Sequence, residues 1–313
     1  FRFRGATTAT QGRAAATGIC LSAFSSGSCS CTGTPASSCS HGTVAGGANE
    51  YRLYAADASG AGENWYLRSS VPAVTPPATP GDPQTPPAPV ITYRPEAALY
   101  AALPSQLRQG SLAMLGDLHK RMGDDDDLRR GATAMPGASA TVQPRRAWAR
   151  VISSDIDIEQ RGTVSPSSDG RYTGLQAGTD LLATPNWRAG VYVGQMDGDA
   201  TVRGFVSGVN QLRAGSNDLR SQYLGIYGTY ANDSGFYADA VLQPGRHRYT
   251  VQPSAGVGVE GRGNSLLGSI EVGQGFALGA SGWQVEPQLQ VIAQQMDLDA
   301  ASIPRATVGP DAD

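Results

Sequence analysis

The sequence predicts an all-β fold, a transmembrane antiparallel β-barrel, and three observations carry that prediction. Residues 145–313 divide into seven runs of about 12 to 16 residues, longer than the roughly five or six of a usual strand. In these runs an apolar side alternates with a side of polar or small residues. Short polar turns alternate with longer loops between the runs. Long two-sided strands with unequal connections are typical of membrane barrels, whereas a soluble β-sandwich has no reason to make strands this long.

The composition narrows the function classes. The 313 residues carry a net charge of −3 and are 16% charged, so no basic surface argues for nucleic acid as a partner. No apolar run approaches the roughly 20 residues of a membrane helix, so a membrane role would depend on strands. The 40 glycines suit strands and turns better than long helices.

Residues 1–48 are predicted to be a low-complexity or frame-shifted segment. They contain no Asp, Glu or Lys, show no apolar periodicity, and hold all four cysteines, from Cys20 to Cys39. A small disulfide-stapled or metal-binding module is the alternative, for which four cysteines allow three pairings. The spacing of Cys29 and Cys31 does not match the common zinc patterns, so no metal site is assigned.

Residues 49–70 and 71–94 are the next two predicted units. The runs EYRLYAAD and ENWYLRSS are rich in aromatic and aliphatic residues, and they predict a hairpin or a pair of sheet rungs. A proline-rich tract from Pro72 to Pro89 follows. It should lie extended as polyproline II and serve as a linker.

Residues 95–144 are predicted to contain an amphipathic helix followed by an acidic turn. Apolar residues recur at helical spacing from Leu99 to Met122, and Pro104 and Gly110 should kink or divide the helix. The four aspartates at residues 124–127 should end it, because carboxylates are unfavourable at the negative end of a helix. A calcium loop would need alternating ligands, so these aspartates are interpreted as a solvated turn.

The strand region, residues 145–313, is predicted from its turns. Tight polar turns are expected at residues 184–186, 232–235 and 279–282, and longer connections at about 160–170, 202–217, 252–264 and 298–310. The predicted strands are therefore 146–159, 171–183, 187–201, 218–231, 235–250, 265–278 and 283–297. Because short turns of such barrels face the periplasm, the helix should end there and run through the lumen, with the N-terminal segment outside.

This order of parts resembles the autotransporters of type V secretion, from about residue 49 to the end. NEYRLY and ENWYLRSS look like the closing part of a pertactin-like passenger β-helix, a short β-rung remnant. The stretch YRPEAALYAALPSQLRQGSLAMLGDLHKRMG resembles the helical segment before the barrel, RRAWARV its first strand, and WQVEPQLQVI a later strand.

The resemblance implies an outer-membrane translocator domain that anchors and delivers an N-terminal passenger to the cell surface. It implies a barrel of 12 strands, monomeric when complete, in contact with outer-membrane lipid. The expected partners are the barrel-assembly machinery, periplasmic chaperones and the protein's own passenger segment. The chain departs from the family pattern in having about 7 of 12 strands, and unpaired strand edges in lipid cost several kcal/mol for each backbone group. It is therefore expected to be truncated and non-functional as given.

No catalytic residue, cofactor-binding residue or metal ligand is assigned, and the protein is predicted not to be an enzyme. The sequence lacks the Gly-x-Ser-x-Gly pattern of a nucleophile elbow, and Ser281 lies in a predicted turn. Asp239 and His247 share one strand about 26 Å apart, too far for a catalytic pair, and His247 is expected near the outer rim, among lipid headgroups or loops. The resemblance implies self-cleavage only with an Asn-Asn pair, which is absent. The alternatives are a plain porin-like channel, or a surface-anchored enzyme whose catalytic passenger is missing.

Overall fold

The computed structural model describes residues 13–14, 43–55, 61, 64–71, 89–116, 118, 121, 147–278, 283–299 and 308–309, and the structural statements below concern these residues. Several predicted features lie outside them: the four cysteines, the proline tract between residues 72 and 88, the aspartates at 124–127 and the turn at 279–282.

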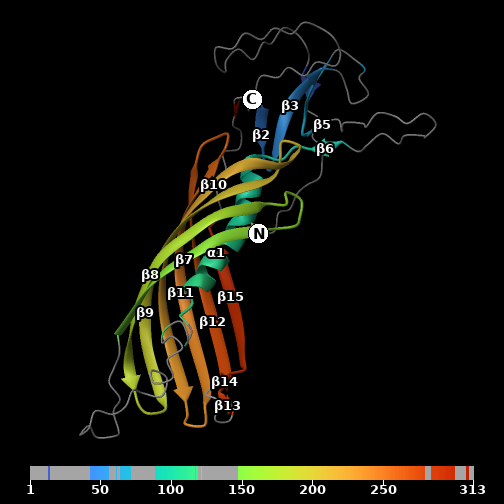
Figure 1. Cartoon of the computed structure of the whole chain (residues 1–313). Coiled ribbons are helices and arrows are strands. Elements are labelled where there is room, and N and C mark those ends of the chain that lie inside the picture. Colours follow the sequence, from blue (N-terminus) through green and yellow to red (C-terminus); the bar gives the residue numbers. More distant parts are fainter. Residues whose placement is uncertain are drawn as a thin grey trace, which may run out of the picture.

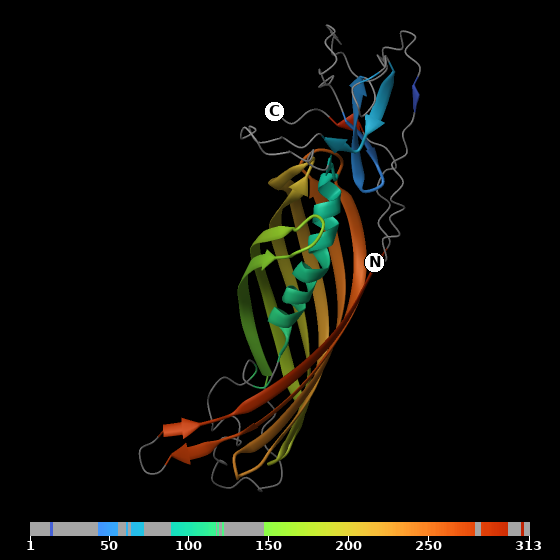
Figure 2. The same cartoon turned by 90° about the vertical axis from the view of Figure 1, so that its right-hand side faces the viewer.

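Seven antiparallel strands form one curved sheet that wraps around a single long helix (Figures 1 and 2). The strands are β7 (Ala147–Glu159), β8 (Ser167–Ala183), β9 (Trp187–Val206), β10 (Val209–Ala231), β11 (Phe236–Pro253), β12 (Val259–Gln274) and β15 (Gln288–Leu298). Each pairs with the next strand along the chain, except that the small hairpin β13 (Phe276–Leu278) and β14 (Trp283–Val285) comes between β12 and β15. The predicted antiparallel β-fold is confirmed, and among the described residues the sheet is open, with β7 and β15 at its edges.

The tight turns at residues 184–186 and 232–235 lie where the sequence predicts them. In the second, the side-chain oxygen of Asn232 accepts hydrogen bonds from the backbone N–H groups of Ser234 and Phe236, each at 3.1 Å. Gly235 adopts a φ of 86°, which favours glycine. We call the end of the sheet that carries these turns the turn end, and the opposite end the loop end.

The predicted connection at residues 202–217 is wrong. β9 and β10 continue through it to a turn of only Ser207 and Gly208, with φ angles of 52° and 84°. Register shifts between Val209 and Gly215 absorb the irregular residues that gave the segment the composition of a loop. The connections predicted at 160–170 and 252–264 shorten to 160–166 and 254–258 for the same reason, because strand pairing extends into them.

The helix α1 (Pro95–Met114) spans 20 residues and lies against the concave face of the sheet. The helix is not divided at Pro104 or Gly110, because α1 continues through both, so of the two predicted outcomes, a kink or a division, the division is wrong. A Cβ at Gly110 would lie 3.2 Å from the Tyr172 ring, so the missing side chain gives the wall room to approach. Packing along the whole helix outweighs the backbone hydrogen bond lost at Pro104.

A second, smaller sheet lies beyond the loop end (Figure 2). It contains β1 (Arg13–Ala14), β2 (Thr43–Gly46), β3 (Asn49–Ala55), β4 (Trp65–Arg68) and β16 (Val308–Gly309), while β5 (Ser70–Val71) pairs with β6 (Val90–Ile91). β3 and β4 pair antiparallel, with Leu53 opposite Leu67. The hairpin is therefore the alternative that is observed, since stacked rungs of a parallel β-helix would pair in parallel.

Candidate functional site: a lumen filled by a helix

The two faces of the sheet carry opposite kinds of side chain. We call the space on the concave side the lumen. Its wall carries buried tyrosines together with buried amide, carboxylate and imidazole groups, namely Tyr172, Tyr192, Tyr223, Tyr227, Tyr237, Tyr249, Gln176, Asp180, Asn217, Asp239, Gln243, His247 and Glu271. The convex face exposes aliphatic side chains, among them Val151, Leu175, Val193, Leu224, Ile226, Leu242, Ile270 and Val291. This distribution is the reverse of that in a water-soluble sheet protein.

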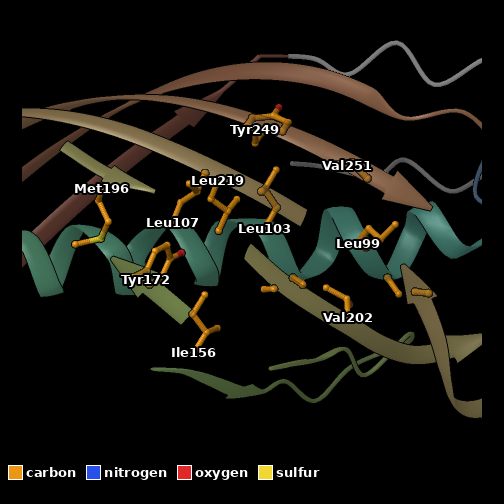
Figure 3. Close-up of a cluster of buried hydrophobic side chains, with 14 of the residues drawn as sticks. Leu99, Leu103, Leu107, Ile156, Tyr172, Met196, Val202, Leu219, Tyr249 and Val251 are labelled. Carbon is orange, nitrogen blue, oxygen red and sulfur yellow. The ribbon is translucent and has the colours of Figure 1, made fainter. Parts of the chain in front are cut away.

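An apolar cluster holds α1 against the wall (Figure 3). From the helix, Leu99, Leu103 and Leu107 are almost completely buried, and they lie four residues apart on one face, as predicted. From the wall come Ile156, Tyr172, Met196, Val202, Leu219, Tyr249 and Val251. The lumen is therefore filled by side chains along the length of the helix.

Polar side chains of the wall bind the backbone carbonyls of α1. The Nδ2 atom of Asn217 donates to the Leu99 carbonyl at 3.1 Å, and the Tyr172 hydroxyl donates to the Gln106 carbonyl at 2.6 Å. The Nε2 atom of Gln243 donates to the Ser111 carbonyl at 3.0 Å. The Ser111 carbonyl lies in the last turn and lacks an intrahelical partner, so Gln243 satisfies a buried acceptor there, whereas the carbonyls of Leu99 and Gln106 accept these bonds as second hydrogen bonds.

The wall also caps the C-terminal end of α1. The Arg150 guanidinium donates to the carbonyls of Met114 and Leu115 at 3.3 and 3.0 Å, and Gln176 donates to Met114 at 2.8 Å. The last turn of α1 contains no basic residue of its own. Arg150 therefore supplies, from β7, the positive charge that the negative end of a helix favours.

Below the helix, Arg121 forms a buried ion pair with the wall. Its guanidinium lies 2.5 Å from Oδ1 of Asp239 and 2.9 Å from the Thr229 hydroxyl oxygen, and it sits 4.0 Å above the centre of the Tyr227 ring. The same guanidinium donates to the Gly116 carbonyl. No sequence signal could identify this contact, because Arg121 and Asp239 are 118 residues apart.

The prediction that His247 lies among lipid headgroups or loops is wrong, because its side chain faces the lumen. Its ring is buried, with Nδ1 2.8 Å from the Ser221 hydroxyl and Nε2 2.8 Å from the Ser265 hydroxyl. Alternation along β11 explains the difference: Arg246 and Arg248 face outward, so His247 must face the lumen. Asp239 and His247 bind separate partners, and His41 and His119 lie outside the described residues.

The small sheet is joined to the loop end through Glu50. The Glu50 N–H donates to the Thr92 carbonyl at 3.0 Å, and the Thr92 hydroxyl donates to the Glu50 carbonyl at 2.6 Å. Ser207, in the β9–β10 turn, donates from its hydroxyl to the Glu50 carboxylate at 2.5 Å and from its N–H to the Tyr93 carbonyl at 2.8 Å. The segment that enters the helix is therefore fixed to the rim of the sheet.

Within the described ranges, no helix has both the length and the apolar character needed to cross a bilayer. The same residues contain no group of three or more His, Cys, Asp or Glu that could hold a metal ion. What they build is a curved wall whose polar inner face is shaped to hold a segment of the chain.

Comparisons with known proteins agree with this architecture. The chain is 32% identical to the pertactin autotransporter of Bordetella bronchiseptica over 152 residues, which are 46% of this chain and 15% of the relative. It is 29% identical to the BrkA autotransporter of Bordetella pertussis over 203 residues, 63% of this chain and 18% of the relative. It is 29% identical to the probable autotransporter YcgV of Escherichia coli K12 over 152 residues, 46% of this chain and 15% of the relative.

The chain thus spans less than a fifth of the length of these relatives. No solved structure matches it. The family model of the autotransporter beta-domain matches residues 147–304, half of the chain and the whole of the curved sheet. The chain therefore belongs to the autotransporter β-domain family, whose members are outer-membrane translocator domains of protein secretion and are generally not catalytic.

Proposed function

We propose that the protein anchors in the outer membrane and delivers the segment that precedes α1 to the cell surface. The direction of α1 in the lumen carries this proposal. Its first turn lies near the loop end, where Tyr93 binds Ser207, and the chain beyond it reaches Arg121, which binds Thr229 near the turn end. Apart from the turn at Ser207 and Gly208, the longer connections, 160–166 and 254–258, lie at the loop end, and because short turns of such barrels face the periplasm, the chain before α1 emerges outside.

The side chains on the convex face support a position for the membrane along the strands. Near the turn end, Trp187, Tyr230 and Phe236 form an outward aromatic cluster, with ring centres 5.0 and 6.4 Å apart. Aromatic girdles mark the interfaces of membrane barrels. Leu224 and Ile226 follow on β10, exposed and apolar, as the hydrocarbon layer requires.

Exposed ion pairs support where the apolar belt formed by exposed residues such as Leu224 and Ile226 ends, on the side of the loop end. Arg220 pairs with Asp197 at 2.7 Å, and Arg171 pairs with Asp155 at 2.9 Å, in both cases between neighbouring strands on the convex face. Charged side chains are costly in hydrocarbon but not beyond it. The strands therefore extend past the bilayer on the side of the loop end.

We propose the same domain boundaries as the sequence predicts. Residues 49–70 are the end of the passenger, 71–94 the linker, 95–144 the pore helix and acidic turn, and 145–313 the barrel region. The segment at 1–48 precedes the passenger end. Insertion would use the barrel-assembly machinery and periplasmic chaperones, because β7 and β15 present open edges that need partners in lipid.

Surface labelling tests the delivery. An epitope inserted after Gly47, an exposed turn residue of the small sheet, should bind antibody on intact cells. The matched epitope after Asp233, exposed at the turn end, should bind only after the outer membrane is permeabilised. Labelling of both epitopes, or of the second alone, on intact cells would contradict the proposed orientation.

Conductance separates the translocator from a plain porin-like channel. A closed barrel that includes these seven strands should conduct weakly in a planar bilayer, because α1 occupies the lumen, and deletion of residues 95–122 should raise the conductance. Equal conductance with and without this segment would show that the helix does not fill the pore.

A further inference from the structure

We propose that Tyr227, Thr229 and Asp239 form a guanidinium seat that fixes the register of α1 in the lumen by binding Arg121. The proposal rests on the proposed function, because a register has to be selected only where the chain has moved through the lumen. In this role Arg121 and Asp239 are positioning residues that stop the chain at one place along the pore.

Most apolar contacts of α1 do not select a register by themselves. Leu99, Leu103 and Leu107 repeat every four residues, and Ala98 and Ala102 have the same spacing. Sliding the helix by four residues, about 6 Å along its axis, would place one leucine where the next one was. At these leucine and alanine positions the repeat does not distinguish neighbouring registers, and only the close approach of Tyr172 to Gly110 does so among the apolar contacts of α1 described above.

Most polar contacts of α1 would also allow the helix to shift by four residues. Asn217, Gln243 and Gln176 bind the backbone carbonyls of Leu99, Ser111 and Met114. Every residue carries such a carbonyl, so these bonds can re-form after a shift. A contact between two particular side chains cannot. Gln106 of α1 makes two uncharged contacts of this kind, donating to the Ser168 hydroxyl at 3.0 Å and accepting from Asn217 at 2.9 Å, and the seat adds a charged one.

The seat supplies such a contact. The guanidinium of Arg121 and the carboxylate of Asp239 are almost completely buried, 2.5 Å apart, and a displaced chain would break this pair. A buried charge that loses its partner is strongly destabilising. Fixing a register is the best-attested role of buried polar groups in otherwise repetitive packing.

The chemistry of the seat favours a guanidinium over an ammonium group. Asp239 accepts from two nitrogen atoms, at 2.5 and 3.3 Å, while the planar group lies 4.0 Å above the Tyr227 ring. Thr229 accepts one further hydrogen bond, at 2.9 Å. A planar fork that stacks on an aromatic face fits this arrangement, and a lysine ammonium does not reproduce it.

Engineered disulfides can report the register directly. A Cβ built at Gly204 lies 3.0 Å from the Ala98 Cβ and 2.8 Å from the Val164 carbonyl oxygen, so cysteines at positions 98 and 204 can bond after a small shift of the backbone at Gly204. If α1 moved outward by four residues, Ala102 would take the place of Ala98. The pair Ala98→Cys with Gly204→Cys therefore reports the seated register, and Ala102→Cys with Gly204→Cys reports an overrun.

The test compares two carboxylates that face each other across neighbouring strands. Asp239 pairs in register with Glu271, and both are buried on the lumen wall; Arg121 binds Asp239, whereas the Tyr237 hydroxyl donates to Glu271 at 2.8 Å. Both disulfide pairs are measured in outer membranes, in a background in which the four native cysteines are serine. Asp239→Asn should lower the ratio of seated to overrun disulfide about tenfold or more, whereas Glu271→Gln should leave it unchanged.

Two further variants separate the seat from general loosening of the wall. Arg121→Lys should lower the ratio less than Arg121→Ala, because the charge remains but the planar fork is lost. The exchange of the two charges, Arg121→Asp with Asp239→Arg, should recover most of the ratio that either single change removes. An unchanged ratio in Asp239→Asn, or an equal fall in Glu271→Gln, would overturn the proposal.

Surface exposure of the epitope after Gly47 is measured in the same cells. Its absence in the unmodified protein would contradict the proposed delivery, while the disulfide ratio would still decide whether the seat sets the register. Normal exposure in Asp239→Asn together with a lowered ratio is the expected result.

Discussion

The inner and outer faces of the same strands differ in side-chain type and in exposure. On β10, Tyr223, Tyr227 and Thr229 face the lumen and are buried, whereas Leu224 and Ile226 face outward and are exposed. In water this arrangement would be unfavourable, because the aliphatic side chains would remain hydrated. It is favourable where lipid covers the outside and a helix fills the inside. The comparison teaches that α1 supplies much of the apolar core that the wall lacks.

The largest expected effect comes from α1 itself. Leu103→Ala should lower the free energy of unfolding of the lipid-inserted protein by about 2–5 kcal/mol, because Leu103 is completely buried between helix and wall. Leu112→Ala, on the exposed side of the same helix, should change it by less than about 0.5 kcal/mol. Guanidinium titration of both variants in vesicles checks this, and equal losses would show that the helix has no preferred face.

A charge on the outer face should have the next largest effect. Ile226→Arg places a cation in the apolar belt and should cost about 2–4 kcal/mol. Val257→Arg, in the connection between β11 and β12 at the loop end, should cost less than about 0.5 kcal/mol. The same titration measures both, and an unaffected Ile226→Arg variant would mean that lipid does not cover this face.

Two glycines on β10 allow the inner and outer faces to be compared by the addition of a single methyl group. A Cβ at Gly225 would lie 1.9 Å from the Tyr192 ring, whereas a Cβ at Gly228 meets nothing within 4 Å. Gly225→Ala should therefore destabilise the protein by about 1–3 kcal/mol, through displacement of that ring. Gly228→Ala should change the unfolding free energy by less than about 0.5 kcal/mol. Similar values for the two would contradict the close packing of the lumen wall.

The smallest expected effect is the loss of one hydrogen bond. Tyr172→Phe removes the hydroxyl that donates to the Gln106 carbonyl at 2.6 Å, and it should cost about 0.5–1.5 kcal/mol. Tyr230→Phe, at the outward aromatic cluster, should cost less. Unfolding titrations of the two variants side by side measure the difference, and a larger loss at Tyr230 would reverse the expected order.

Periodicity in the sequence predicted the features that depend on local pattern. The alternation along β10 and β11, the turns at residues 184–186 and 232–235, and the helical spacing of Leu99 and Leu103 are all present. Each of these depends on residues close in sequence, where side-chain direction follows from the backbone geometry alone.

Features that depend on distant partners could not be predicted in this way. The length of β9 and β10 beyond residue 201 depends on pairing between the two strands, and composition alone suggested a loop. The continuity of α1 at Pro104 depends on the wall around it. The contact between Arg121 and Asp239 joins residues 118 apart, so neither residue stands out in the sequence.

The length of β10 has a consequence for the first surface that an emerging chain meets. Its 23 residues extend about 75 Å at roughly 3.3 Å per residue, while a tilted strand needs only about 9–11 residues to cross the hydrocarbon layer. In the proposed orientation more than half of the strand stands clear of the bilayer. A newly exported segment would therefore meet the charged rim and water before it met any headgroup, and ionic strength rather than lipid composition would govern that first encounter.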